Sequence, residues 1–220
     1  MALSRQEKPR KNAGRSNQKA RTRTALLHAA TELVGEGRPP SMPEAADRAL
    51  ISVATAYRYF SSAEELWWEA SKTIAFQGPM TEAELRVEEA GNDPRARVEA
   101  LIRSIGFWML DNQMPYRQMT RAALEQWFRQ TEVPESEQVP IREGRRNEQI
   151  RNAISPLRDE FRQEDVDRIA HALALVISSE AVIALCDAVG LDVPAAKESL
   201  LDAGRWLLAG ALAELTSREK

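Results

Sequence analysis

The segment from Ser41 to Leu66, SMPEAADRALISVATAYRYFSSAEEL, predicts two short helices joined by a tight turn and followed by the start of a third. Four apolar residues at helical spacing give the first helix one apolar face: Ala45, Ala46, Ala49 and Leu50. Ser52 is placed to cap a second helix over about residues 53–59. Ser62 and Glu65 then form a capping box that opens the third helix. The pattern predicts a helix-turn-helix and limits the chain to folds that can carry one.

The second of these helices gathers polar and aromatic side chains within about two turns. They are a hydroxyl, two phenols and a guanidinium, on Thr55, Tyr57, Arg58 and Tyr59. Such groups suit contacts to phosphates and base edges better than they suit core packing. The alternative is that they are ordinary surface residues of a helix pair. We favour the first interpretation and predict an interface for double-stranded DNA.

The charge of the chain is concentrated at its N-terminus. Residues 1–23 hold eight Lys and Arg residues against Glu7 alone, a net charge of +7, which leaves −10 for the rest of a chain whose net charge is −3. A basic segment on an otherwise acidic protein is typical of a nucleic-acid contact. We predict a disordered basic arm over residues 1–20, with Arg21 and Arg23 as further DNA-binding residues. A disordered tail that only improves solubility is the alternative.

The helix-turn-helix segment also resembles the DNA-binding domain of TetR-family (TetR/AcrR-like) transcriptional regulators, over about residues 22–70. The residues that carry the resemblance are Ala46, Ala49, Ile51, Ser52, Thr55, Tyr57, Phe60, Glu64, Glu65 and Leu66. Two residues depart from the family pattern: Leu50 stands in the turn, where Gly is usual, and Ala63 stands where Lys is common. The resemblance implies that Tyr57 contacts a phosphate, and that four residues lie nearer the groove: Ser52, Val53, Thr55 and Arg58.

The rest of the chain predicts an all-α fold. Few β-branched residues alternate along the sequence, and apolar residues recur at helical spacing. Gly78–Pro79 marks a boundary, so we expect a helix-turn-helix domain over residues 21–76 and a helical bundle over residues 77–220. Two long helices end the bundle, from about Glu164 to Val189 and from about Pro194 to Thr216. The resemblance implies that these two helices form a homodimer with a second subunit.

Trp, Phe, Tyr and Met residues gather in little more than twenty positions of the bundle. Adaptable Met and flat aromatic side chains suit a pocket for a mostly apolar small molecule. The residues that we assign to such an effector pocket are Phe107, Trp108, Met119, Trp127, Phe128 and the acidic Glu180. The alternative is that the aromatic and Met residues form an ordinary bundle core, and that Glu180 and similar charges are paired structural groups.

Several classes of protein are disfavoured by the sequence. The lone Cys186 excludes a disulfide within the chain, and two His residues far from it offer no metal-ligand spacing. We find no Gly-rich phosphate loop and no nucleophile elbow, so we expect neither an enzyme nor a cofactor. The most apolar stretch, residues 169–189, is interrupted by His171, Glu180 and Asp187, so we expect no membrane span and a cytoplasmic protein.

These predictions together describe a homodimeric transcriptional regulator, most simply a repressor that a small-molecule effector releases from its operator. Two other classes remain open. One is an architectural DNA-binding protein without an effector. The other is a helical protein–protein interaction module whose helix-turn-helix does not bind DNA.

Overall fold

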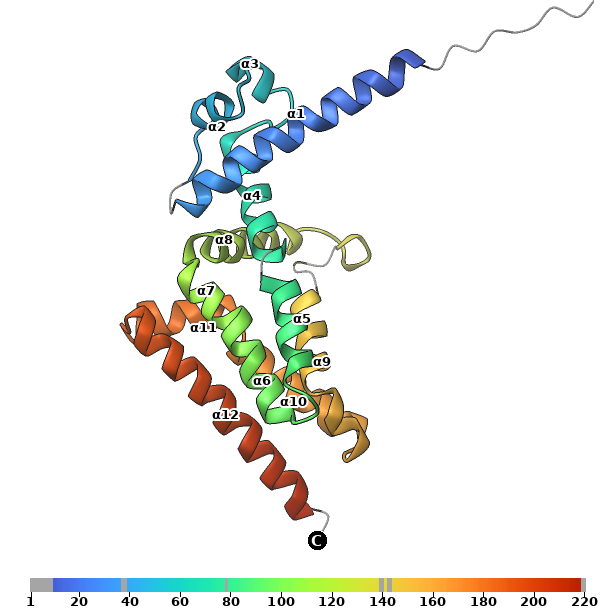
Figure 1. Ribbon diagram of the computed structural model, residues 1–220, viewed down its shortest axis with the longest axis vertical. Helices are drawn as coiled ribbons and strands as arrows, with labels where there is room; N and C mark the ends of the chain where they lie inside the picture. Colours follow the sequence, from blue (N-terminus) through green and yellow to red (C-terminus); the bar gives the residue numbers. More distant parts are fainter. Residues whose placement is uncertain (1–9, 37–38, 78, 139–140, 142–143, 219–220) are drawn as a thin grey trace, which may run out of the picture. The chain divides into compact units, whose positions relative to one another are not determined.

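The computed structural model describes residues 10–36, 39–77, 79–138, 141 and 144–218. Over these residues the chain forms helices, turns and loops and contains no strand (Figure 1). The prediction of an all-α fold is therefore confirmed. The chain divides into two compact units, Met1–Thr73 and Ile74–Lys220, which we call unit 1 and unit 2.

Unit 1 is built from α1 (Arg10–Gly35), α2 (Met42–Arg48), α3 (Val53–Ala56) and the first part of α4 (Ala63–Gln77). One face of α1 packs on the short helices. The buried apolar residues of the unit are Leu26, Ala29, Ala30, Leu33, Val34, Met42, Ala45, Ala46, Ala56, Phe60, Leu66 and Ala70. Many of them are Ala, which lets the short helices approach α1 closely.

The N-terminal basic segment differs from the sequence prediction. The expectation of disorder up to residue 20 is wrong for residues 10–20, which belong to α1, while residues 1–9 lie outside the described residues. The physical reason is cooperativity. Arg, Lys, Gln and Ala dominate this stretch and are good helix formers, and the buried face from Leu26 to Val34 anchors the helix that they extend.

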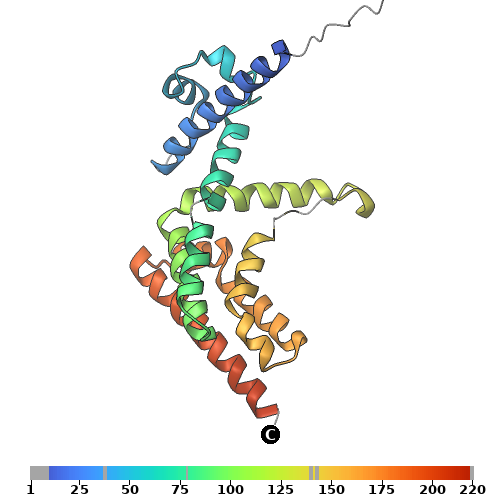
Figure 2. The same cartoon turned by 45° about the vertical axis from the view of Figure 1, so that its right-hand side comes forward.

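Unit 2 contains a longer series of helices. In chain order they are α5 (Pro79–Glu89), α6 (Pro94–Leu101), the π-helical turn η1 (Ile102–Gly106), α7 (Phe107–Asp111), α8 (Gln113–Gln130), the short 3₁₀ turn η2 (Glu135–Glu137), α9 (Arg145–Ala153), the 3₁₀ turn η3 (Ser155–Asp159), α10 (Gln163–Val176), α11 (Ser179–Ile183), the π-helical turn η4 (Ala184–Ala188) and α12 (Val193–Arg218). Figures 1 and 2 show α12 along one side of the unit with α6 beside it, while α8 runs across one end. Helix α6 contacts α5, α9 and α12 and is the centre of the bundle.

A buried arginine joins three of these helices. Arg97 of α6 is 8% exposed, and its guanidinium donates hydrogen bonds to four backbone carbonyls. Two of them, of Val87 and Gly91, belong to the C-terminal end of α5 and the residues after it, and the other two, of Asn152 and Ala153, belong to the end of α9. The ends of helices present carbonyls without helical partners and a partial negative charge, and both favour a cation at this position.

Two glycines set the distance between α12 and η1. A Cβ atom on Gly106 would lie 2.6 Å from Leu200 Cδ2, and one on Gly204 would lie 2.2 Å from Ile102 Cδ1. Both distances are far shorter than van der Waals contact, so a larger residue at either position has to displace its neighbour. Ile102 is fully buried and has little room to move.

The helix predicted from Glu164 to Val189 is interrupted, so that prediction is wrong in its middle. Ile177 has φ −89° and ψ 70°, outside the helical region, and separates α10 from α11. The Ser178 hydroxyl accepts a hydrogen bond from the Ala181 N–H at 3.0 Å and caps α11. Serine side chains offer the backbone this alternative to a continuous helix.

By length and composition alone, the segment Gln163–Ala188 would be able to span a membrane, with a mean hydropathy of 2.0 in its most apolar stretch, 39% of which is buried. A core helix of a bundle has the same properties. Val166, Ile169, Leu173 and Val182 of this segment lie in the buried core of unit 2.

We expect Gly204→Ala to destabilise the protein by about 1–2 kcal/mol, because overpacking against Ile102 outweighs the better helix propensity of Ala. Gly210→Ala is the matched control on the same helix: its Cβ would meet no atom within 4 Å. That variant should be neutral or more stable by up to about 1 kcal/mol. Urea unfolding of both variants measures the difference, and equal midpoints would contradict the close approach at Gly204.

Candidate nucleic-acid interface

Helix α2 begins with a reciprocal cap. The Ser41 hydroxyl accepts a hydrogen bond from the Glu44 N–H at 3.3 Å, and the Glu44 carboxylate accepts one from the Ser41 N–H at 3.2 Å. Pro43 occupies the first turn of the helix, where it removes no helical hydrogen bond. Met42, Ala45 and Ala46 face the core of unit 1. The cap and the buried face together fix where α2 starts and how it is oriented.

The turn after α2 depends on a leucine with a positive φ. Leu50 has φ 56°, the left-handed conformation in which the family that the sequence resembles usually has Gly. Its N–H donates to the Asp47 carbonyl at 3.0 Å, and the Ile51 N–H donates to the Ala46 carbonyl at 2.9 Å. This pair of hydrogen bonds is the Schellman arrangement that ends many helices. Leu50 is 92% exposed, so its side chain contributes little packing to offset the backbone strain.

Helix α3 follows at once and is also capped. The Ser52 hydroxyl accepts a hydrogen bond from the Thr55 N–H at 3.1 Å and lies 2.8 Å from the Thr55 hydroxyl. The regular helix ends at Ala56 and is therefore shorter than the predicted range of 53–59. Beyond it the chain tightens: the Arg58 and Tyr59 N–H groups donate to carbonyls only three residues back. The prediction of a helix reaching Tyr59 is therefore wrong by one turn.

The segment from Ser52 to Phe60 has one exposed and one buried side. Ser52, Val53, Ala54, Tyr57 and Arg58 are exposed, Thr55 and Tyr59 are half-buried, and Ala56 and Phe60 are fully buried. Among the described residues, the Arg58 guanidinium has no ion-pair or hydrogen-bond partner. The predicted DNA-binding residues of this segment thus lie on or beside one surface. Exposed Ala54 lies among them and was missed by the sequence prediction, because Ala has no group that signals a contact.

The buried side of this segment is held by Phe60 and Arg23. Phe60 is completely buried, and the Arg23 guanidinium carbon lies 4.8 Å from the centre of its ring. Arg23 also forms an ion pair with Glu69 of α4. Arg23 therefore joins α1 to α4 within unit 1, which makes it a poorer candidate for a phosphate contact than Arg21. Arg21 is exposed and has no partner among the described residues.

Helix α4 begins with two serines and one glutamate. The Ser62 hydroxyl accepts from the Glu65 N–H at 3.1 Å, as the predicted capping box requires. The Glu65 carboxylate, however, accepts from the N–H and the hydroxyl of Ser61, both at 2.6 Å, and not from Ser62. These hydrogen bonds from Ser61 lower the pKa of Glu65. They order the chain between α3 and α4.

The residues assigned to an effector pocket differ in how far they are buried. Phe107, Trp108 and Met119 are partly buried against the core of unit 2. Trp127 and Phe128 are 52% and 65% exposed and pack on each other edge to face, with ring centres 5.1 Å apart. Glu180 is also exposed. Trp127, Phe128 and Glu180 are therefore weak members of this set in a single copy of the chain.

Other charges within the apolar helices form pairs, as the structural alternative predicts. Arg103 pairs with Glu99, Asp111 pairs with Lys197, and Asp187 pairs with Arg117. The hydrogen bonds from Arg117 lower the pKa of Asp187. Within the described ranges, no group of three or more His, Cys, Asp or Glu side chains is arranged to hold a metal ion.

Comparison of the sequence with protein-family models finds no matching family, and comparison with characterised proteins finds no match. The resemblance to TetR-family regulators therefore rests on the residues of the helix-turn-helix segment.

We expect Leu50→Gly to stabilise the protein by about 0.5–1 kcal/mol. Gly removes the roughly 1–2 kcal/mol cost of a left-handed residue with a Cβ atom, and part of this gain is offset by the greater freedom of the unfolded chain. Leu50→Ala is the control, because Ala keeps the Cβ atom and should bring no such gain. Thermal unfolding followed by circular dichroism measures both. A lower melting temperature for Leu50→Gly than for Leu50→Ala would contradict the strain at this turn.

Proposed function

We propose that the protein is a DNA-binding transcriptional regulator that acts as a homodimer. The observation that carries the proposal is the exposed side of the segment Ser52–Arg58, on a short helix whose other side is buried. The segment combines hydroxyl, phenol and guanidinium groups with two small or apolar residues, Val53 and Ala54, that allow close approach to a base edge. The Ser52 cap and the buried Phe60 position the exposed groups of this helix.

In this proposal the contacts divide into two kinds. Tyr57 and Arg21 contact phosphates and set the position of the protein on the duplex, while Ser52, Val53 and Arg58 lie nearer the base edges. One such helix reads too few base pairs for specific binding. A dimer with two-fold symmetry places two of them about 34 Å apart, which matches successive major grooves on one face of DNA. The operator is then a pseudo-palindrome.

The proposed dimer forms through the last two helical segments, α10 to η4 and α12. Leu175 of α10 and Trp206 of α12 are 76% and 72% exposed, which is unusual for large apolar side chains and is typical of a surface that associates. Ala213 is small and exposed and leaves room on the outer side of α12 for another helix. These features support association without identifying the partner by themselves.

The proposal also includes an apolar effector bound in unit 2. Trp108 supports this part: its indole Nε1 is buried and has no hydrogen-bond partner among the described residues. A buried donor without a partner is costly, and a bound molecule with an acceptor would satisfy it. Effector and DNA would then oppose each other, with a coupling of about 1–3 kcal/mol that acts equally in both directions.

The first test of the proposal is the recognition surface. A DNA sequence is selected from a random pool with the full chain, and its affinity is measured at one salt concentration. Arg58→Ala should weaken binding by about 5- to 150-fold, because a contact to a base or phosphate is worth about 1–3 kcal/mol. Tyr57→Phe should weaken it less, because only the phenol hydroxyl is removed.

The control for this test is Arg86→Ala, which removes an exposed arginine whose ion pairs lie within α5. Its affinity should equal that of the original chain. If Arg58→Ala and Tyr57→Phe also leave affinity unchanged, or if no sequence is selected, the segment Ser52–Arg58 is not a DNA-binding surface. Light scattering that shows only the monomeric mass at micromolar concentration would exclude the dimer.

The second test separates Arg21 from Arg23 by the salt dependence of binding to random-sequence DNA. Arg21→Gln should make the slope of log K against log[salt] shallower by about 0.9 for each phosphate that the protein no longer neutralises. Arg23→Gln should leave the slope nearly unchanged and should lower the melting temperature, because Arg23 pairs with Glu69 and stacks on Phe60. An unchanged slope for Arg21→Gln would remove that residue from the interface.

A further inference from the structure

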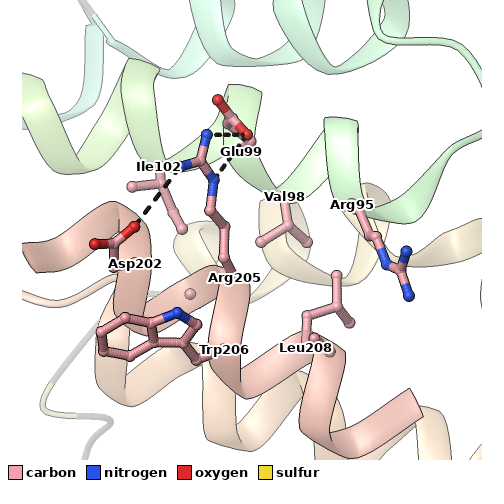
Figure 3. Close-up of a pocket in the computed structure, with 10 residues that line it drawn as sticks. Arg95, Val98, Glu99, Ile102, Asp202, Arg205, Trp206 and Leu208 are labelled. Atoms are coloured by element: carbon pink, nitrogen blue, oxygen red, sulfur yellow. Dashed lines mark hydrogen bonds and ion pairs between the residues drawn. The ribbon is translucent and has the colours of Figure 1, made fainter. Parts of the chain in front are cut away.

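Unit 2 has a hollow of about 580 Å³ between α6 and α12 (Figure 3). Its floor is apolar and rigid, because Val98, Ile102 and Leu208 are almost fully buried. The indole of Trp206 borders the hollow and is 72% exposed. The volume lies in the range of small-molecule sites, which are about 300–1,000 Å³. None of the residues assigned above to the effector pocket lines this hollow.

The charges around the hollow are balanced except for one. Glu99 accepts from Arg103 at 2.7 Å and from Arg205 at 2.8 Å, and these two arginines hold the pKa of its carboxyl below the usual value. Arg205 also lies 3.6 Å from Asp202. Figure 3 shows Arg205 between Glu99 and Asp202 at this end of the hollow, and with Arg103 the two carboxylates offset two guanidinium groups.

The remaining charge is Arg95, which stands at the other end of the hollow in Figure 3. Its guanidinium has no ion-pair or hydrogen-bond partner within the described part of the chain. A guanidinium presents donors in a planar fork that matches a carboxylate. The hollow thus combines an apolar floor, a flat aromatic wall and one uncompensated cation.

We propose that this hollow binds a planar aromatic carboxylate. The aromatic body would lie over Val98 and Leu208 beside the indole of Trp206, where burial of apolar surface and ring contacts favour it. Its carboxylate would pair with Arg95. The site is separate from the DNA surface and from the assigned effector residues, and it shares Trp206 with the proposed dimer surface. A ligand here goes beyond the function proposed above.

A second copy of the chain is the other candidate occupant, because Trp206 also belongs to the proposed dimer surface. An apolar helix face laid over the hollow would offer the exposed Arg95 guanidinium no partner. An anionic small molecule covers the same apolar floor and also pairs with Arg95, so the charge distribution favours it.

The test compares 2-naphthoate with neutral 2-naphthamide by isothermal titration calorimetry on the full chain without DNA. The original chain should bind naphthoate more tightly than naphthamide. Arg95→Gln should weaken naphthoate by about 3- to 10-fold, the range of a partly exposed charge pair, and leave naphthamide unchanged. Arg95→Lys should restore part of the preference, and Trp206→Ala should weaken both compounds. Arg86→Gln on α5 is the control and should change neither.

Three results would overturn the proposal: no binding of either compound, equal affinity of the original chain for both, or an unchanged naphthoate affinity in Arg95→Gln. If Trp206→Ala turns a dimer into a monomer by light scattering while naphthoate affinity stays the same, the hollow is a contact between copies and the proposal fails. Because no DNA is present, none of these outcomes depends on the proposed DNA-binding function.

Discussion

The packing of unit 2 depends on the buried side chain of Arg97, which joins α6 to α5 and α9. Its guanidinium lies among the carbonyls at the ends of α5 and α9 while its backbone belongs to α6. Burying a charge without a carboxylate is costly, and here the cost is offset by hydrogen bonds that the carbonyls would otherwise lack. The residue therefore holds the ends of α5 and α9 against α6. Helices α10 and α12 add to this centre mainly by apolar packing.

Much of the fold could be predicted from local sequence signals. Ser52 caps α3 as expected, and α12 spans Val193–Arg218 where apolar periodicity indicated about residues 194–216. The predicted helix boundaries were wrong where one local sequence signal competed with another, or with packing elsewhere in the chain. The Ser178 cap interrupts a strongly apolar helix, and residues 10–20 of the basic segment are helical because α1 includes them. The role of Arg97 had no local signal, because its partners lie up to 56 residues away.

The exposure of the residues in the two predicted sites could be predicted to different extents, for a physical reason. The exposed side of α3 follows from four short-range facts: two caps, a turn and a buried Phe60 nearby in the sequence. Apart from the acidic Glu180, the effector set depended on apolar character alone, which is the same for a core residue and for an exposed one. The rings of Trp127 and Phe128 pack on each other at the surface, and their spacing in the sequence does not indicate this contact. The sequence did not indicate Arg95 as a binding residue, because an arginine in the first turn of a helix is common. It stands out only once the structure shows that Glu99 and Asp202 pair with other arginines.

The shortness of α3 has a consequence for how firmly its surface is held. A helix of four residues with one buried side chain, Ala56, has almost no stability of its own, so its order is supplied by the Ser52 cap, Phe60 and the strained turn at Leu50. Its amide protons should exchange with solvent through local opening, well before unit 1 unfolds globally. Any ligand of this surface then binds only the closed fraction of molecules, and its apparent affinity is reduced by that fraction.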